Sequence, residues 1–115
     1  MFKSVEYSAF EEHPRLLELA KRAVSVLATE VRCWHNQIDV ECIVHPDNPT
    51  GMEFTVTLNL PTGSGTGSRF FLVSELEDSD RLLGCCHDVW DRALGDYLEK
   101  RKSAWEEIIQ QPVEV

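Results

Sequence analysis

Cysteine and histidine are the residue types in this chain that could bind a metal ion or act as nucleophiles. The candidate ligands are Cys33, His35, Cys42, His45, Cys85, Cys86 and His87. A structural zinc site needs four convergent ligands. Cys42 and His45 are an odd number of positions apart in a predicted strand and so face opposite sides, while adjacent Cys85 and Cys86 diverge by about 100° on a helix. The spacing predicts no metal site and no cofactor.

A nucleophilic cysteine beside a histidine, at Cys85, Cys86 and His87, is the corresponding enzyme hypothesis. Such a thiol needs surroundings that stabilise the thiolate, whereas the neighbouring Asp80 and Asp88 would raise the thiol pKa. The glycine run at positions 63–67 lacks the Gly-Lys-Ser/Thr ending of a phosphate loop and leads into a predicted strand. We therefore predict a protein that is not an enzyme, with reduced cysteines acting as small apolar side chains.

Length and charge narrow the function classes further. The 115 residues predict one domain spanning 1–115, because domains commonly hold about 100 to 150 residues. With 11 Lys and Arg against 20 Asp and Glu, the formal net charge is -9, which argues against a dedicated DNA-binding protein. No apolar run reaches the roughly 18 residues that span a bilayer, and the first residues lack the apolar run of a signal peptide. We expect a cytoplasmic protein with no membrane partner.

The segment 38–60 gives the strongest signal for secondary structure. From Met52 to Leu60 apolar and polar residues alternate, which is typical of a strand with one buried face. Turn residues at 46–51 separate this strand from another at 38–45. The glycine-rich stretch 61–68 predicts a flexible connection to a strand at 69–74, and imperfect alternation predicts a first strand at 2–10.

Two helices are predicted on either side of these strands. Pro14 suits the first turn of a helix over 14–31, and apolar residues recur there at helical spacing. A longer helix over 79–109 follows an acidic segment, and its predicted core stripe is Leu82, Leu83, Cys86, Val89, Trp90, Ala93, Tyr97 and Leu98. The fold class is thus α+β: a two-layer β-α-β-β-β-α arrangement whose four-stranded sheet carries both helices on one face.

This element order resembles the short ribosome-hibernation proteins, the family of the hibernation-promoting factor and the ribosome-associated inhibitor. The stretch at 5–31 is similar to the family's first strand and helix, 52–61 to its third strand, and 74–78 to the Ser-Glu-Asp segment before its last helix. The resemblance implies a regulator of translation that docks in the RNA channel of the small ribosomal subunit. Two departures are the absence of Lys and Arg between Arg32 and Arg69, and Tyr7-Ser8 where the family has Gly-Arg.

RNA docking requires exposed cations, since phosphate contacts supply most of the affinity. The predicted RNA-binding residues lie on the helices and are Lys21, Arg22, Arg81, Arg92, Lys100, Arg101 and Lys102. The competing interpretation is local ion pairing, because Glu18 and Arg22, Asp88 and Arg92, and Asp96 and Lys100 are each four residues apart with the acid first. Only the cluster of cations at 100–102 is dense enough to favour RNA binding over local ion pairing.

The second function hypothesis is an acidic protein-interaction module: a homo-oligomer subunit or nucleic-acid mimic that binds a basic protein partner. The net charge of -9 supports it. Two apolar flanks also support it, one on the helix predicted at 14–31 and one near the C-terminus. Either flank could contact a partner or form a homodimer. The predicted interface residues are Leu19, Val26, Trp105, Ile108 and Ile109. Packing of both flanks into a slightly larger core is the alternative.

Overall fold

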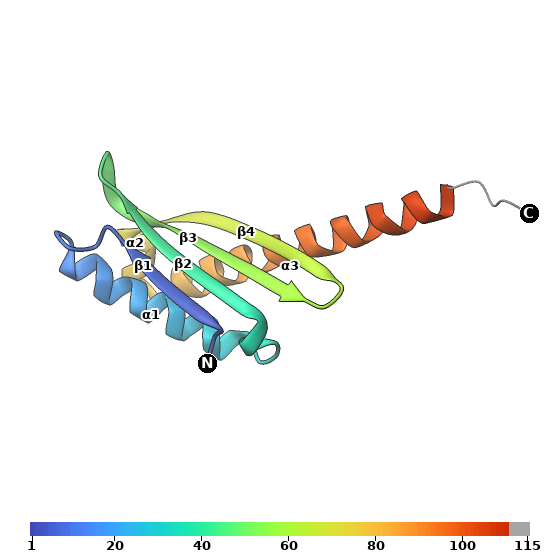
Figure 1. Ribbon diagram of the computed structural model, residues 1–115. Coiled ribbons are helices and arrows are strands. Elements are labelled where there is room, and N and C mark those ends of the chain that lie inside the picture. Colours follow the sequence, from blue (N-terminus) through green and yellow to red (C-terminus); the bar gives the residue numbers. More distant parts are fainter. Residues whose placement is uncertain (111–115) are drawn as a thin grey trace, which may run out of the picture.

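The computed structural model of the protein describes residues 1–110. The element order is strand, helix, three strands and two helices, with one turn of 3-10 helix before the second strand (Figure 1). The elements are β1 (Ser4–Ser8), α1 (Pro14–Glu30), η1 (His35–Gln37), β2 (Ile38–His45), β3 (Asn48–Leu60), β4 (Gly63–Leu72), α2 (Val73–Glu77) and α3 (Ser79–Gln110). The predicted α+β class and element order are confirmed, and the short helix α2 is an addition.

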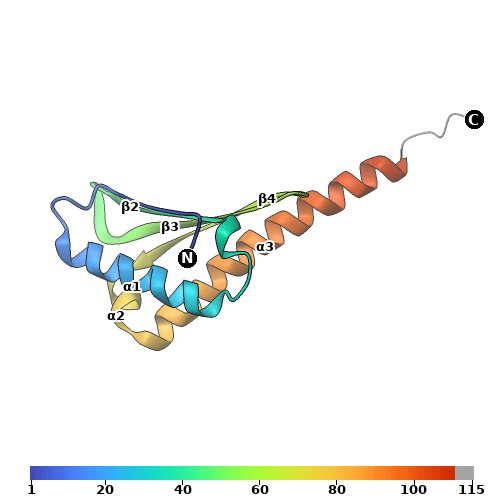
Figure 2. The same cartoon turned by 60° about the horizontal axis from the view of Figure 1, so that its bottom comes forward.

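The four strands form one sheet in the order β1-β2-β3-β4. β1 runs parallel to β2, while β2, β3 and β4 pair as antiparallel neighbours. All three α-helices lie on the same side of the sheet, as Figure 2 shows when the sheet is seen nearly edge-on. The opposite side of the sheet, which we call the outer face, is covered by no element of the described chain.

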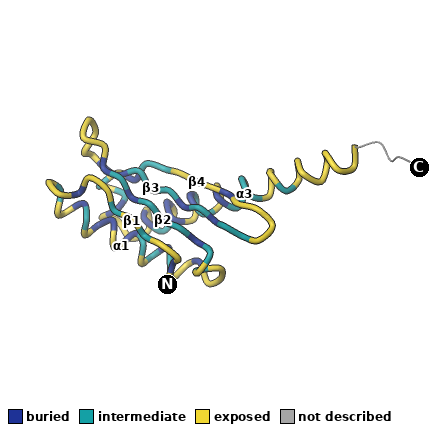
Figure 3. Tube along the Cα trace, in the orientation of Figure 1, coloured by how far each residue is buried: buried dark blue, intermediate teal, exposed yellow. Residues whose placement is uncertain are grey.

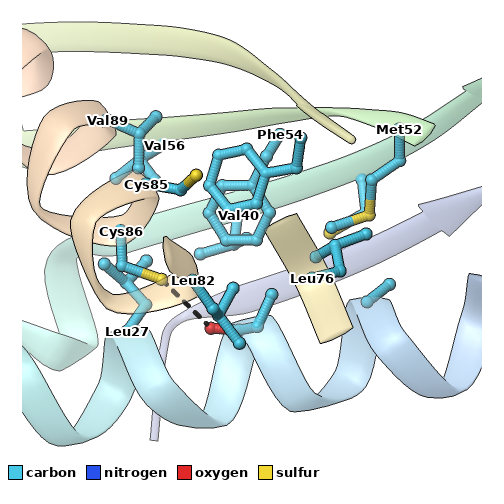
Figure 4. Packing of buried hydrophobic residues seen from close by; sticks show 14 of the residues in the cluster. Leu27, Val40, Met52, Phe54, Val56, Leu76, Leu82, Cys85, Cys86 and Val89 are labelled. Carbon is cyan, nitrogen blue, oxygen red and sulfur yellow. Dashed lines mark hydrogen bonds between the residues drawn. The ribbon is translucent and has the colours of Figure 1, made fainter. Parts of the chain in front are cut away.

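The core lies between the sheet and the helices (Figure 3). Alternate residues of β2 and β3 point into it, so the period-2 pattern predicted from the sequence is confirmed. The Phe54 and Phe71 rings stack with their centroids 4.8 Å apart. Beside them, the Cys86 thiol lies 3.7 Å from the Ala23 carbonyl oxygen and links α3 to α1 (Figure 4).

The glycine-rich stretch is the main point at which the sequence prediction was wrong. It is no flexible loop: residues 63–72 are all strand β4, paired with β3 in continuous register. Gly65 and Gly67 face α3, and a Cβ atom would lie 2.3 Å from the Ala93 carbonyl oxygen at Gly65 and 2.5 Å from the Val89 carbonyl oxygen at Gly67. These glycines therefore allow the helix backbone to approach the strand closely.

Side chains of α3 also form hydrogen bonds with the free edge of β4, the edge that points away from β3. The Thr66 N–H donates to an Asp96 carboxylate oxygen at 2.8 Å, and the Arg92 guanidinium donates to the Ser68 carbonyl at 2.8 Å. The bond from Thr66, followed by the contact with Lys100, lowers the pKa of Asp96 below its usual value. Backbone groups that another strand would use are thus occupied, which protects an otherwise open sheet edge.

Several predicted boundaries shift for physical reasons. The turn between β2 and β3 needs only residues 46–47, so β3 begins at Asn48, where it pairs with His45. β1 is limited to Ser4–Ser8, since Ala9 has a positive φ of 65° that ends the extended backbone. Val73 and Ser74, predicted to end the last strand, begin α2 instead.

The C-terminal part of α3 projects beyond the sheet, which gives the molecule extents of 64 × 31 × 23 Å (Figure 1). Leu98, predicted to belong to the core stripe, is 61% exposed there because the sheet ends at the turn between β3 and β4. Tyr97 is the last residue of the stripe to contact this turn, through a hydrogen bond between its hydroxyl and that of Thr62. Leu82, Cys86, Val89 and Ala93 are buried as predicted.

Replacing Gly67 with alanine tests the close approach of helix and strand. The added methyl would meet backbone of α3 on two sides, so the helix must move, and we expect a loss of about 1–3 kcal/mol in unfolding free energy. Gly84→Ala and Gly95→Ala are matched controls, because nothing lies within 4 Å of either position on α3. They should raise stability by up to about 1 kcal/mol. Urea unfolding would measure all three, and an unchanged midpoint for Gly67→Ala would contradict the packing described.

Candidate functional site

The outer face of the sheet is a surface built from all four strands that no other element of the described chain covers. The side chains that point to it come from alternate positions of all four strands, since neighbouring residues in a strand face opposite sides. Its acidic members are Glu6, Asp39, Glu41 and Glu53, and its hydroxyl-bearing members include Ser4, Thr55, Thr57, Thr66 and Ser68. None of the strand residues pointing to this face is a lysine or an arginine.

The strand register arranges most of these side chains in two rows across the sheet, and Glu53 lies in a third row between Ile43 and Phe70. One row runs from Glu6 through Glu41 and Thr55 to Ser68. The next begins with Ser4, whose hydroxyl donates to the Asp39 carboxylate at 2.6 Å, and continues across β3 and β4. The Thr55 and Ser68 hydroxyls are 2.7 Å apart, so the acidic half of the face continues into a half lined with hydroxyl groups.

Within residues 1–110, two of the four carboxylates have local partners and two have none. Asp39 also accepts from the Asn59 side chain at 2.7 Å, and Glu53 lies 2.6 Å from the His45 imidazole. Glu6 and Glu41 stand directly opposite each other on β1 and β2. Neither forms an ion pair within residues 1–110. Like charges at facing strand positions destabilise a sheet, so the pair is a cost to the fold that an external cation would relieve.

A shallow hollow of about 300 Å³ lies over these rows. It is lined by Ser4, Glu6, Asp39, Val40, Glu41, Thr55 and Thr57. The lining is mostly polar and includes three carboxylates and no cation, which suits a cationic side chain better than an apolar ligand or a phosphate. No three His, Cys, Asp or Glu side chains among the described residues are placed to hold a metal ion.

Six of the seven predicted RNA-binding residues already have a partner within the described chain. Most already bind an acid or a backbone carbonyl: Arg81 with Asp78 at 3.9 Å, Arg92 with Asp88 at 3.1 Å, Lys100 with Asp96 at 2.9 Å, Arg101 with the Thr62 carbonyl at 3.3 Å and Lys102 with Glu106 at 3.9 Å. Within residues 1–110, Lys21 has no such partner. The expected Arg92 and Lys100 pairs are confirmed.

The third expected pair was wrong. Arg22 donates to the Ser79 hydroxyl at 2.6 Å and so links α1 to the start of α3, while Glu18 pairs with Arg15 instead. Arg69 is held on the helix side of the sheet by Glu75 at 3.0 Å and Asp88 at 3.6 Å. These cations therefore connect elements of the fold, which leaves them less free to neutralise phosphates.

The predicted interface residues separate into two groups. Leu19 is only 2% exposed and packs in the core, so its assignment to a partner surface was wrong: α1 turns this side toward the sheet. Val26 is half-buried and packs against the same core. Trp105, Ile108 and Ile109 remain exposed on the projecting part of α3, at 55%, 61% and 74%.

The thiols offer little reactivity where they are buried. Burial raises the pKa of Cys42 and of Cys86 to about 12, and burial together with the hydrogen bond to Glu75 raises that of Cys85 to about 11. They are therefore protonated near neutral pH. Burial rather than the nearby aspartates is the main cause, which the sequence argument about Asp80 and Asp88 did not anticipate. Cys33 is exposed.

Comparison of the chain with protein-family models, curated proteins and solved structures found no match. The resemblance to hibernation factors consequently stays a prediction. Among the described helices, none combines the length and the apolar character needed to cross a membrane.

Sequence reasoning did not single out Glu6, Asp39, Glu41 and Glu53, although the outward positions of the alternating strands carried the signal.

Removing one of the two unpaired glutamates should stabilise the protein. Glu41→Gln keeps the shape of the side chain but ends the repulsion with Glu6, so we expect a gain of about 0.2–1 kcal/mol in unfolding free energy. Glu53→Gln is the matched control on the same face, and it should bring no gain because Glu53 has His45 as a partner. Thermal unfolding at neutral pH and low salt would show the difference, and a loss of stability in Glu41→Gln would contradict this account of the face.

Proposed function

We propose that the protein is a non-enzymatic interaction module that binds a basic segment of a partner protein on the outer face of its sheet. The observation that carries the proposal is the facing pair Glu6 and Glu41 on an exposed surface, with no cation beside it in the described chain. A lysine or arginine from a partner would replace their repulsion with two ion pairs. The repulsion between the two glutamates lowers the stability of the free protein, and binding of the partner would restore that stability in the complex.

Long-range electrostatics favour the same class of partner. The net charge of -9 attracts basic proteins and repels nucleic acids before contact, and such steering raises association rates. The cations of the chain are largely held in local pairs on the helix side, as described above. A phosphate-binding surface requires cations that are free to release counterions.

The mode of binding follows from the two rows of side chains. Lysine and arginine side chains of a partner would meet the carboxylates over β1 and β2, and its polar groups would meet the hydroxyls over β3 and β4. Addition of a strand at β4 is disfavoured, because Asp96 and Arg92 already occupy groups on that edge. On this proposal the partner segment lies across the face of the sheet, where it reaches both rows.

Docking on the small ribosomal subunit is the second candidate function. The observation that favours it is the order of elements along the chain, with the helices on one face of a four-stranded sheet, because the resemblance rests on that order. On that proposal the protein would co-sediment with small ribosomal subunits at low salt and be released as salt rises. Its absence from the ribosomal pellet at low salt would exclude this candidate.

A labelled oligolysine peptide tests the main proposal. We expect binding that weakens as salt rises, with the Glu6→Gln/Glu41→Gln double variant losing about three- to tenfold in affinity as two ion pairs disappear. The matched control is Glu11→Gln/Glu12→Gln, which removes the same charge from exposed positions before α1. Fluorescence anisotropy would measure both affinities, with a labelled single-stranded RNA as the second probe.

The charge-matched control separates a site from general attraction. If both double variants lose affinity equally, the peptide responds only to net charge and the outer face is not the site. Binding of the RNA in preference to oligolysine would also contradict the proposal. An unchanged affinity for RNA and a selective loss of oligolysine binding in the outer-face variant would support it.

A further inference from the structure

The part of α3 beyond the sheet, residues 98–110, which we call the arm, exposes large apolar side chains on one side. Leu98, Trp105 and Ile109 are 61%, 55% and 74% exposed. At about 100° per residue, their spacing places them within about 40° of one another around the helix. The acidic residues of the arm lie beside this stripe or opposite it: Glu106 is about 60° and Glu99 about 80° from Ile109, and Glu107 points to the other side of the helix.

A helix of this length is only marginally stable in water without tertiary contacts. The arm receives its last contact from the sheet through Arg101, which donates to the Thr62 carbonyl. An apolar stripe that contains Trp105, on a helix with no other support, is typical of a surface that another helix covers. The question is which helix fits it.

The order of charges along the arm identifies a second copy of this chain as the occupant. Cations at 100–102 come before acids at 106–107. In an antiparallel pair centred between Ser103 and Ala104, the Lys102–Glu106 ion pair of one copy lies beside the same pair of the second copy in reversed order, so that each Lys102 is next to two glutamates on the same flank of the helices. The opposite, parallel arrangement would place each cation run against an identical cation run. We infer that the protein forms an antiparallel dimer through its arms.

The apolar stripe fits the same register. With the axis between positions 103 and 104, Leu98 lies level with Ile109 of the second copy, and Lys102 lies level with Trp105. The first pair excludes water by apolar contact, and the second brings an ammonium group to an indole ring, which is a favourable cation–π contact. Each contact occurs twice, because a two-fold axis makes the interface self-complementary.

Elsewhere in residues 1–110, the outer face of the sheet is the other large exposed surface to consider as a self-interface. The outer face of the sheet repels a second copy, since its four acidic residues would meet four more. The arm is instead electrically balanced, with Lys100, Arg101 and Lys102 against Glu99, Glu106 and Glu107. Pairing through the arms keeps the two acidic sheets apart and leaves both outer faces open.

Sedimentation equilibrium of the full chain over a concentration series tests the inference. We expect the mass to rise from 13.1 kDa toward twice that value. Trp105→Asp should weaken dimerisation about tenfold or more, since it removes the central contact and places a carboxylate in the stripe. Trp34→Asn is the matched control, an exposed tryptophan outside the arm, and it should dimerise as the wild type does.

Mass that stays at the monomer value in the wild type, or a Trp105→Asp variant that dimerises normally, would overturn the inference. Circular dichroism of both variants confirms that their sheets and helices are intact. The orientation of the two arms is measured separately, in a Cys33→Ser background that removes the exposed native thiol. Spin labels on Gln110→Cys should then lie more than about 20 Å apart in the antiparallel dimer, because thirteen residue steps of helix separate them. A substantially shorter distance would indicate a parallel pair and reject the proposed register.

Discussion

The close approach of α3 to the glycine residues of β4 is the contact on which the rest of the structure depends. Gly65 and Gly67 let helix backbone lie where a side chain would otherwise stand. This contact directs the long helix along the last strand and places Asp96 and Arg92 beside its edge. The edge is occupied as a result, and the helix leaves the sheet in a fixed direction.

Two surfaces follow from that geometry. Because all three α-helices lie on one side of the sheet, the other side carries mainly polar residues, together with Ile43 and Phe70, and its Glu6 and Glu41 form no ion pair within residues 1–110. Because α3 is longer than the sheet, its final turns are held by neither strand nor helix, and its apolar stripe is exposed. The two surfaces differ in chemistry and lie apart, so each can be changed without the other.

The sequence predicted the elements whose signal is local. Alternation defined β2 and the core of β3, and helical spacing located α1 and α3 to within a residue at most ends. It failed for β4, because glycine is normally evidence for a turn and its role here appears only once α3 is placed against it. The same limit applies to Leu19 and Leu98: their burial depends on where the sheet begins and ends, which periodicity does not reveal. The pair Glu6 and Glu41 required the register of two strands 35 residues apart in the chain.

The central claim is that the outer face of the sheet receives a basic partner. An NMR titration of the isotope-labelled protein with oligolysine tests it most directly, because each backbone amide reports separately. The account predicts that the amide signals of Glu6, Glu41 and Thr55 move first and that those of α1 remain in place. Shifts confined to the helices, or spread evenly over every acidic residue of the surface, would contradict it.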